Sequence, residues 1–367
     1  MSSQSFPVLI TGGGTGGHVY PALALADELV ARGHDRADIH FVGAARGIER
    51  DAVPAAGYTI DLLPGRGMLR ERSWRSLRQN VGTALDTVRA FAEAMRIVRA
   101  RRPAVVVGFG GYASLPCVAA ARLRRVPAVV HESDAHPGLA NRIAVRLGAR
   151  PAVSLPGTPL AGAVVTGNPI RPEIARVRRT PVAPPTVAVV GGSLGSRTIN
   201  GAALELYDRW RGRGDVVIHH VSGARDYDWC SVHLAARRRP GDGLVYRLVR
   251  YEDAMDTVYA EATVMVTRAG GMTAELAAVG MPSVLVPLPG APGDHQTANA
   301  VYFAQAGAAV MVPDAELDGA RLAEVLDGLL GDPGRLATMG DTARGLAHLD
   351  ATARFADLVT EVARGRR

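Results

Sequence analysis

The stretch TGGGTGGHVYP, residues 11–21, combines a glycine-rich turn with a histidine and a proline. Gly12, Gly14 and Gly17 have the GxGxxG spacing of a dinucleotide-binding turn, and the preceding apolar run FPVLI predicts a short buried strand. A dinucleotide site also needs an acidic residue at the end of the second strand, where it binds the ribose hydroxyls. The second predicted strand, DIHFVG, has its acidic residue at its start, which is the wrong end of the sheet. The pattern therefore disfavours a nicotinamide site.

The histidine that ends this turn, His18, could act as a base. Glycines let an oxygen-rich ligand approach the backbone amides of Thr15, Gly16 and Gly17 at a helix N-terminus, with His18 directed at that ligand. An isolated histidine near a helix start is more often a cap or a packed polar residue, and the glycines alone could serve tight helix–strand packing. Both alternatives stay open on these residues alone.

Two later stretches could bind the phosphates of a nucleotide. GGSLGS follows the apolar run TVAVV and presents backbone amides and the hydroxyl of Ser193 at a helix start, which suits a pyrophosphate without a metal. In RAGGMTAE, two glycines precede a predicted helix, so Met272 and Thr273 can offer amides to phosphate while Glu275 accepts bonds from ribose hydroxyls. For the first stretch, plain packing of the glycines is the simpler alternative.

An Asp-x-Asp pair occurs in DYD at residues 226–228, a pattern with which some enzymes hold a divalent metal. No other motif converges on it, so we interpret it as a solvated helix start. The sequence predicts no cofactor and no metal.

The motifs fall on a repeating strand–helix pattern. Strand-like runs at PVLIT, DIHFVG, AVVVGF, AVVH and AVVTG alternate with helical stretches at 18–32, 76–100 and 112–124. A second set, TVAVV, VVIHHV, LVYRL, TVMVT, PSVLVP and AAVMV, follows a Pro-rich segment. The sequence therefore predicts the α/β class, with two doubly wound Rossmann-like domains whose ligands bind at the carboxyl ends of the strands, in a shared cleft.

The length of 367 residues also favours two domains, because one core rarely serves so long a chain. We expect an N-terminal domain over residues 1–166, a linker over 167–185 and a C-terminal domain over 186–344. No apolar run is long enough to span a membrane, and two distant cysteines indicate neither a disulfide framework nor a zinc site. The formal charge of +7, with arginine as the only basic residue type besides histidine, favours an anionic partner such as a nucleotide phosphate or an acidic lipid headgroup.

The stretch GGTGGHxxPALALA, at residues 13–26, resembles the N-terminal signature of the MurG family, the glycosyltransferases that add N-acetylglucosamine (GlcNAc) to the lipid-linked muramoyl-pentapeptide of peptidoglycan synthesis. Six further motifs resemble those of this family and occur in order across both halves. They are GFGGYASLP at 108–116, HESD at 131–134, GNPIR at 167–171, GGSLGS at 191–196, RAGGMTAELAAVGMP at 268–282 and DHQTANA at 294–300. Such an ordered set is far more specific than one glycine loop.

The resemblance implies a GT-B fold and an inverting transfer of GlcNAc from UDP-GlcNAc to the muramoyl 4-hydroxyl of undecaprenyl-pyrophosphoryl-MurNAc-pentapeptide. It implies that the N-terminal domain binds this acceptor, that the second-domain loops bind UDP, and that a final helix within 345–367 packs back on the first domain. It also implies a peripheral protein on the cytoplasmic side of an anionic membrane. No nucleic-acid partner is expected.

The resemblance also assigns site residues. Glu132 joins His18 as a catalytic candidate. The candidates for substrate binding are Thr15, Gly16, Gly17, Asp134, Arg171, Ser193, Glu252, Met272, Thr273, Glu275, Gln296 and Asn299. Of the two amides in DHQTANA, Gln296 is the stronger candidate for reading the GlcNAc hydroxyls, because capping of a helix N-terminus is an equal alternative for Asn299.

The sequence departs from the family pattern at two places. Thr273 and Glu275 are separated by one residue where the family has two, and one residue turns a helix by about 100°. Asp134 replaces the usual asparagine of HESD, so an ionised carboxylate that only accepts hydrogen bonds stands where the family has an amide. These departures motivate an alternative, a relative that glycosylates another lipid-phosphate or a small molecule in a specialised pathway.

Residues 65–85 mix five arginines with apolar residues at helical spacing. Such a stripe is usually the core face of a helix, and the alternative is a patch that touches an anionic membrane. Two further functions remain possible for the whole chain. They are a non-catalytic protein that binds a UDP-sugar and an epimerase that converts UDP-GlcNAc without an acceptor.

Overall fold

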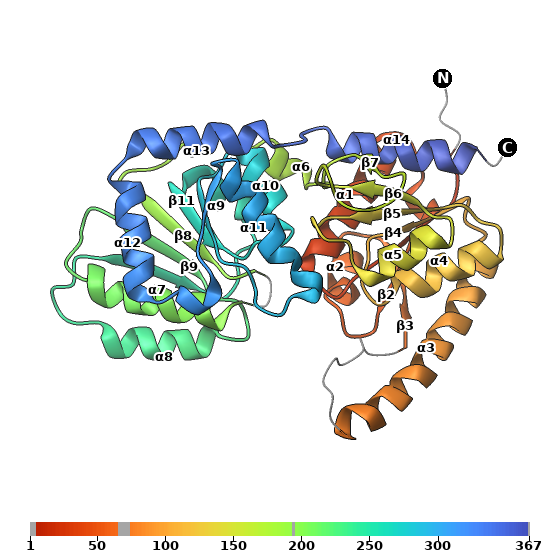
Figure 1. The fold of residues 1–367 in the computed structure, drawn as a ribbon, viewed down its shortest axis with the longest axis horizontal. Helices are drawn as coiled ribbons and strands as arrows, with labels where there is room; N and C mark the ends of the chain where they lie inside the picture. Colours follow the sequence, from red (N-terminus) through yellow and green to blue (C-terminus); the bar gives the residue numbers. More distant parts are fainter. Residues whose placement is uncertain (1–4, 65–73, 193–194, 366–367) are drawn as a thin grey trace. The chain divides into compact units, whose positions relative to one another are not determined.

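The computed structural model describes residues 5–64, 74–192 and 195–365, with side chains from residue 86 onward in the helix that begins at Trp74. The chain forms two compact units (Figure 1). The first comprises Met1–Arg171 and Leu349–Arg367, and the second comprises Pro172–His348. The boundary between Arg171 and Pro172 falls inside the segment that the sequence predicts as a linker.

The described residues of the first unit form a parallel sheet in the order β3-β2-β1-β4-β5-β6-β7. Its strands are β1 (Val8–Thr11), β2 (Ile39–Ala44), β3 (Thr59–Leu63), β4 (Val105–Gly108), β5 (Ala128–Glu132), β6 (Arg150–Val153) and β7 (Val164–Val165). Its helices are α1 (Gly16–Ala31), the short η1 (Arg36–Asp38), α2 (Glu49–Ala55), α3 (Trp74–Arg101), α4 (Ser114–Leu123), α5 (Leu139–Arg146) and α14 (Ala351–Arg364).

Helices cover both faces of this sheet, so its central strands β1 and β4 are buried along their whole length. Val8 and Ile10 of β1 point to a core shared with α1 and α14, whereas Leu9 between them points to a core shared with α3 and α4. The C-terminal helix α14 packs against α1, although more than 300 residues separate them in the sequence (Figure 1).

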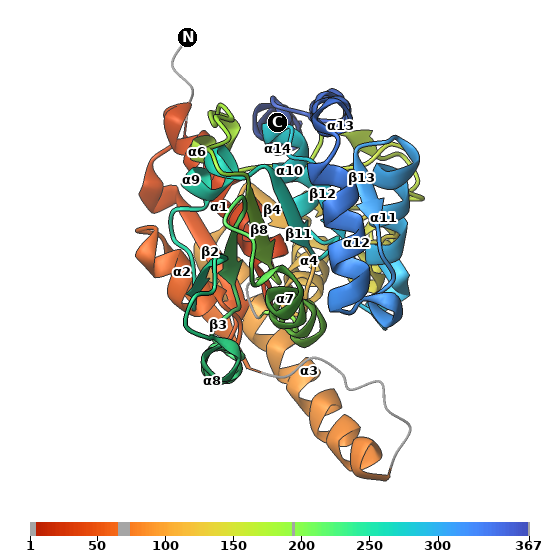
Figure 2. The same ribbon diagram turned by 90° about the vertical axis from the view of Figure 1, so that its left-hand side faces the viewer.

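The second unit repeats the design, with a parallel sheet in the order β10-β9-β8-β11-β12-β13. Its strands are β8 (Thr186–Val190), β9 (Val217–Val221), β10 (Val245–Val249), β11 (Val264–Thr267), β12 (Ser283–Leu285) and β13 (Ala309–Met311). Its helices are α6 (Pro172–Ala175), α7 (Arg197–Trp210), α8 (Tyr227–Arg237), α9 (Met255–Glu261), α10 (Met272–Val279), η2 (Pro292–Asp294), α11 (His295–Gln305), η3 (Asp314–Glu316), α12 (Gly319–Leu330) and α13 (Pro333–Gly345). On one face α7 packs against α12 (Figure 2).

The predicted class, α/β with two doubly wound Rossmann-like domains, is confirmed. In each unit the strand order reverses beside the first strand, between β1 and β4 and between β8 and β11. Ligands of such sheets bind in the crevice at this reversal, outside the carboxyl ends of the strands. The two glycine-rich turns follow β1 and β8, so both lie at these points. No helix of the described part of the chain is long and apolar enough to cross a membrane.

Candidate active site

The first glycine turn connects β1 to α1 at the strand reversal of the first unit. Gly14 has φ +93°, a backbone conformation that favours glycine, and Thr15 precedes the helix in an extended conformation with φ −136°. The Thr15 side chain makes no capping hydrogen bond to the start of α1. The first helical amides, those of Gly16 and Gly17, lie at the positive end of the helix dipole. The three residues predicted to bind a ligand thus form the N-terminus of α1.

His18 lies in the first turn of α1 and is half-buried. Its Nδ1 is 3.0 Å from the carbonyl oxygen of Gly13. Because a carbonyl only accepts hydrogen bonds, Nδ1 must carry the proton, and in the neutral ring Nε2 then has a free lone pair. A Cβ atom at Gly110, just after β4, would lie 3.3 Å from Nε2, so glycine leaves this nitrogen open. The geometry gives His18 the tautomer that a general base requires.

Glu132, the last residue of β5, is 5% exposed, and its carboxylate organises the following loop. It accepts hydrogen bonds from the backbone amides of Asp134 at 3.1 Å and Gly138 at 2.9 Å and from the Asn141 amide at 2.9 Å. Burial, with a smaller contribution from the neighbouring Asp134 carboxylate, raises the pKa of Glu132. Both oxygens are thus engaged within the protein, and this arrangement positions the HESD loop.

His131, beside it on β5, is buried and holds two motifs together. Its Nε2 bonds to the carbonyl of Gly167, at the start of GNPIR, at 3.0 Å. Its ring packs against Phe109 and Phe355. Burial lowers its pKa to about 4, so the ring is neutral at physiological pH. Sequence analysis did not identify this structural role.

Arg171, at the end of GNPIR, lies against the helix that carries His18. Its guanidinium carbon is 4.9 Å from the ring centroid of Tyr20, a cation–π geometry. Asp134 is partly exposed in the loop after β5. The structure therefore brings the candidates of the first unit to one edge of one sheet, on the segments after β1, β5 and β7.

The second glycine turn connects β8 to α7 at the strand reversal of the second unit. Ser196 caps α7, since its hydroxyl accepts a hydrogen bond from the Ile199 amide at 3.3 Å. A Cβ atom at Gly195 would lie 2.2 Å from the carbonyl oxygen of Ser222, so only glycine permits this close approach to the loop after β9. Ser193, the predicted phosphate ligand, lies outside the described residues.

Arg268, which begins RAGG, fixes this turn from the end of β11. Its guanidinium donates to the Ser196 hydroxyl at 2.6 Å and to the carbonyls of Val286 and Pro287, and it pairs with Asp314 at 2.5 Å. One side chain thus ties the loops after β8, β11 and β12 to η3. Sequence analysis missed this residue, although its place at the head of a matched motif was a usable signal.

Thr273 and Glu275 lie on different sides of the first turn of α10. Thr273 is buried and its hydroxyl donates to the Gly270 carbonyl at 2.9 Å, while Met272 before it is half-buried at the helix start. Glu275 is half-buried, and its Oε2 accepts a hydrogen bond from the hydroxyl of Tyr259, a fully buried residue, at 2.8 Å. A buried phenol thus fixes one carboxylate oxygen of Glu275.

The two amides of DHQTANA have different environments. Gln296 is half-buried and its Oε1 accepts from the Leu288 amide at 3.0 Å, while its Nε2 would be 3.5 Å from a Cβ atom at Gly270. Asn299 is 1% exposed and its Nδ2 donates to the Ala269 carbonyl at 2.9 Å. The structure corrects the capping alternative for Asn299, because the residue lies inside α11 and its side chain bonds to the RAGG loop. Its role in substrate binding stays a prediction.

Glu252 follows β10, the edge strand of the second sheet. Its Oε2 is 3.2 Å from Nε2 of His219 on β9, and its Oε1 accepts from the Ala254 amide at 3.1 Å. The aspartates of DYD are engaged by arginines, with Asp226 near Arg197 at 3.2 Å and Asp228 near Arg250 at 2.6 Å. In the described part of the chain, no group of three or more histidine, cysteine or acidic residues could hold a metal ion.

A buried polar network supports the second glycine turn by joining α7 to β9 and β10. The sequence did not predict it. His220 bonds through Nε2 to the Asn200 side-chain oxygen at 2.9 Å and through Nδ1 to the Tyr246 hydroxyl at 2.7 Å. The Asn200 amide in turn donates to the Ser222 carbonyl at 3.0 Å and to Asp226 at 3.2 Å. Burial lowers the pKa of His220 to about 3, so the network contains a neutral imidazole.

Comparison with known proteins identifies both units. Residues 8–152 match the glycosyltransferase family 28 N-terminal domain, and residues 186–361 match the glycosyltransferase family 28 C-terminal domain. The chain is 41% identical over 371 residues, covering 100% of both chains, to a UDP-N-acetylglucosamine–N-acetylmuramyl-(pentapeptide) pyrophosphoryl-undecaprenol N-acetylglucosamine transferase of Pseudomonas entomophila.

Solved structures agree with this match. A crystal structure of MurG from Acinetobacter baumannii is 26% identical, with a TM-score of 0.74 over 97% of this chain and 99% of that one. A UDP-N-acetylglucosamine 2-epimerase has a TM-score of 0.66 over 99% of this chain and 97% of that one, but it is 13% identical and therefore shares the fold alone. The predicted resemblance to the MurG family and the GT-B fold are confirmed.

Proposed function

The chain belongs to glycosyltransferase family 28, and on that premise we propose that it transfers GlcNAc from UDP-GlcNAc to undecaprenyl-pyrophosphoryl-MurNAc-pentapeptide, a step of peptidoglycan synthesis. The observation that carries the mechanism is the hydrogen bond between His18 Nδ1 and the Gly13 carbonyl. It leaves Nε2 of His18 as the proton acceptor at the carboxyl edge of the first sheet.

In this mechanism the muramoyl 4-hydroxyl attacks the anomeric carbon of GlcNAc while His18 Nε2 takes its proton. The bond from that carbon to the diphosphate oxygen breaks in the same step, so the configuration inverts and a β-1,4 link forms. Negative charge develops on UDP as it leaves. Backbone amides at a glycine turn and the positive end of a helix dipole can stabilise that charge, and the start of α7 offers both.

The two units divide the substrates in this proposal. The first unit binds the lipid acceptor through the segments that carry Thr15, Asp134 and Arg171. The second unit binds UDP-GlcNAc through GGSLGS, the start of α10 and Gln296. Arg268 and the His220 network support these donor loops, since they fix the turn after β8 without requiring a metal.

An assay of acceptors tests this function directly. The protein is incubated with radiolabelled UDP-GlcNAc and either the lipid-linked muramoyl-pentapeptide, a panel of small-molecule acceptors, or no acceptor. We expect label in the lipid product alone. Transfer only to a small acceptor would instead support the specialised-pathway alternative, and conversion of UDP-GlcNAc without acceptor would identify an epimerase.

We further propose that the first unit binds the anionic surface of the membrane, on its cytoplasmic side, as a peripheral protein. The residues 65–85 considered for this role lie outside the described residues or have no described side chains. A second basic region is described: between residues 94 and 172 the sequence has eleven arginines and two acidic residues, Glu132 and Asp134. This imbalance favours attraction to anionic headgroups.

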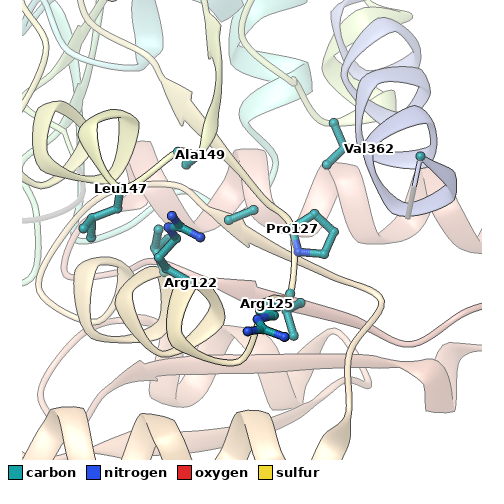
Figure 3. A pocket seen from close by; sticks show the side chains of 11 residues that line it. Arg122, Arg125, Pro127, Leu147, Ala149 and Val362 are labelled. Atoms are coloured by element: carbon teal, nitrogen blue, oxygen red, sulfur yellow. The ribbon is translucent and has the colours of Figure 1, made fainter. Parts of the chain in front are cut away.

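The end of α4 and the turn that follows it combine basic and apolar residues. Arg122, Arg124 and Arg125 are exposed, as is Leu123 between them at 66%. Arg122 and Arg125 also line a cavity of about 420 Å³ that is bordered by the ends of α4, α5 and α14 (Figure 3). An exposed leucine among arginines combines the two attractions that hold a peripheral protein at a membrane.

Two triple variants separate the candidate membrane surfaces. Replacing Arg122, Arg124 and Arg125 with glutamine should weaken binding to anionic vesicles by about 100-fold, since each arginine near such a surface contributes roughly 1 kcal/mol. The same change at Arg70, Arg72 and Arg75 tests the other stretch, and vesicles of neutral lipid are the control. Unchanged sedimentation of both variants with anionic vesicles would contradict membrane binding by either surface.

A further inference from the structure

Glu49, the first residue of α2, has a buried carboxylate in contact with the first glycine turn. The residue is 1% exposed. One oxygen accepts a hydrogen bond from the Gly14 amide at 2.8 Å, and the other accepts one from the Ala44 amide, at the end of β2, at 2.8 Å. Among the described residues no arginine or histidine pairs with it. The carboxylate is thus held by backbone amides, and it ties the turn after β1 to the turn after β2.

Three glycines make room for this side chain. A Cβ atom at Gly13 would lie 2.0 Å from Glu49 Oε1, one at Gly47 would lie 1.9 Å from Oε2, and one at Gly43 would lie 2.4 Å from Cγ. Atoms cannot approach so closely, so each of these positions requires glycine as long as Glu49 occupies the space. The side chain therefore packs as a fixed part of the turn.

The same turn fixes the ring of His18. Gly13, which lies against Glu49, supplies the carbonyl that accepts the Nδ1 proton of His18 at 3.0 Å. On its other side, that carbonyl oxygen would be 2.5 Å from a Cβ atom at Gly111, in the loop after β4. The Gly13 peptide is thus wedged between the Glu49 carboxylate and the backbone of Gly111.

We propose that Glu49 is a positioning residue for the transfer reaction, which holds the Gly13 carbonyl in the orientation that keeps His18 protonated at Nδ1 and free at Nε2. The inference rests on the proposed role of His18 as the base. Glu49 itself touches neither substrate in this account. It binds the N–H of the Gly13–Gly14 peptide group, and the carbonyl of the same group selects the tautomer of the His18 imidazole.

The carboxylate is chemically necessary for this role. Its two oxygens accept from two amides at once, whereas the side chain of Glu49→Gln has one accepting oxygen and an NH₂ group that would face an N–H donor. One buried amide then loses its partner, and the Gly13–Gly14 segment can rotate. Glu49→Asp keeps the charge but shortens the side chain by one methylene, so one carboxylate cannot reach both amides.

Nitrogen NMR of histidine-labelled protein tests the proposal without any substrate. The His18 signals are identified by their loss in His18→Gln. In the wild type we expect the Nδ1-protonated tautomer of His18. In Glu49→Gln we expect the ratio of the Nδ1-protonated to the Nε2-protonated tautomer to fall about tenfold, the effect of losing one hydrogen bond. Asp51→Asn, an exposed acid of the same helix, is the matched control and should leave the spectrum unchanged.

Kinetics give a second readout. Glu49→Gln should lower kcat about tenfold while KM for UDP-GlcNAc changes less than twofold, because donor binding is assigned to the other unit. Should Glu49→Gln not fold, the same measurements on Glu49→Asp decide the matter, with a shift in the same direction. An unchanged His18 tautomer in the folded variant would overturn the role of Glu49. That result would leave the proposed GlcNAc transfer by the wild-type protein untouched, so the role of Glu49 can fail while the proposed function stands.

Discussion

The two glycine turns of this protein have similar sequences and similar places in their sheets, but the charges packed against them differ. The turn after β1 rests on the buried Glu49 carboxylate and leads directly to His18. The turn after β8 is tied by the guanidinium of Arg268 to Ser196, and Arg225 donates to the Gly195 carbonyl at 3.2 Å. The first turn is thus held by a carboxylate that binds backbone amides, whereas the second is held by arginines that are themselves paired with Asp314 and Asp226.

This difference assigns chemistry to turns that glycine spacing alone does not distinguish. The Glu49 carboxylate already occupies the Gly14 amide and places a negative charge beside the first turn, so this turn is suited to orienting a base and less suited to holding a diphosphate. The arginines of the second turn bond to its hydroxyl and carbonyl groups, and the turn leads to the positive end of the α7 dipole, which suits the nucleotide.

The largest effect is expected at His18. His18→Ala should lower turnover by roughly 100-fold or more, because it removes the proposed base for the proton of the muramoyl hydroxyl. Affinity for UDP-GlcNAc should stay nearly intact. His233→Ala, on α8 in the second unit, is a control that should retain activity. An equal loss of donor affinity in His18→Ala, measured by calorimetry, would contradict the division between the turns.

An intermediate effect is expected at Glu275 of the second unit. If the Glu275 carboxylate accepts from both ribose hydroxyls, as proposed, Glu275→Ala removes both bonds and UDP binding should weaken about tenfold to a hundredfold. Tyr259→Phe is the matched control, because it removes the same internal hydrogen bond but keeps the carboxylate. Its UDP affinity should stay within about twofold of the wild type. Unchanged UDP affinity in Glu275→Ala would mean that the shortened Thr273–Glu275 spacing turns this side chain away from the nucleotide.

The smallest effect concerns pH and stability. His131 and His220, one in each unit, have pKa values lowered to about 4 and about 3, whereas a histidine of the unfolded chain titrates near 6.5. Between these values the unfolded chain binds more protons, so stability falls as pH falls below about 6.5. From pH 7.5 to 5.5 each histidine should cost roughly 1 kcal/mol of unfolding free energy.

Denaturant titrations at these two pH values measure that loss. His220→Gln should be less stable at both pH values but should show a smaller dependence on pH, since its unfolded chain no longer gains a proton at this position. An unchanged pH dependence in the variant would contradict a buried neutral His220.

The fold could be predicted because its strands are short, apolar and regularly spaced. The sequence run AVVVGF identified β4, and TVMVT identified β11. Two strands of the first sheet were not predicted. β3, in TIDLL, has only Leu63 fully buried, and β6 contains a proline and is four residues long. Exposure and proline remove the apolar periodicity on which such predictions depend.

Candidate site residues could be proposed from the sequence only where a motif contains them. His18 and Gln296 are such candidates, but their partners Gly13 and Leu288 are backbone groups that any sequence provides. Glu49, His131 and His220 were missed because their importance arises from burial and from hydrogen bonds across the fold. The capping alternative for Asn299 was wrong for the same reason, since sequence shows the amide but not its 1% exposure inside α11.

The most direct test of the account is the stereochemistry of the product. If His18 acts as the base of a single displacement, the α-linked GlcNAc of UDP-GlcNAc must appear in the lipid product with the β configuration, on the muramoyl 4-hydroxyl. NMR of the purified disaccharide, released from the lipid after transfer by the wild-type protein, determines both the configuration and the position. We expect a β-1,4 linkage. A product with retained α configuration would contradict the account, because it requires two displacements or an ion-pair route that no single base at His18 explains.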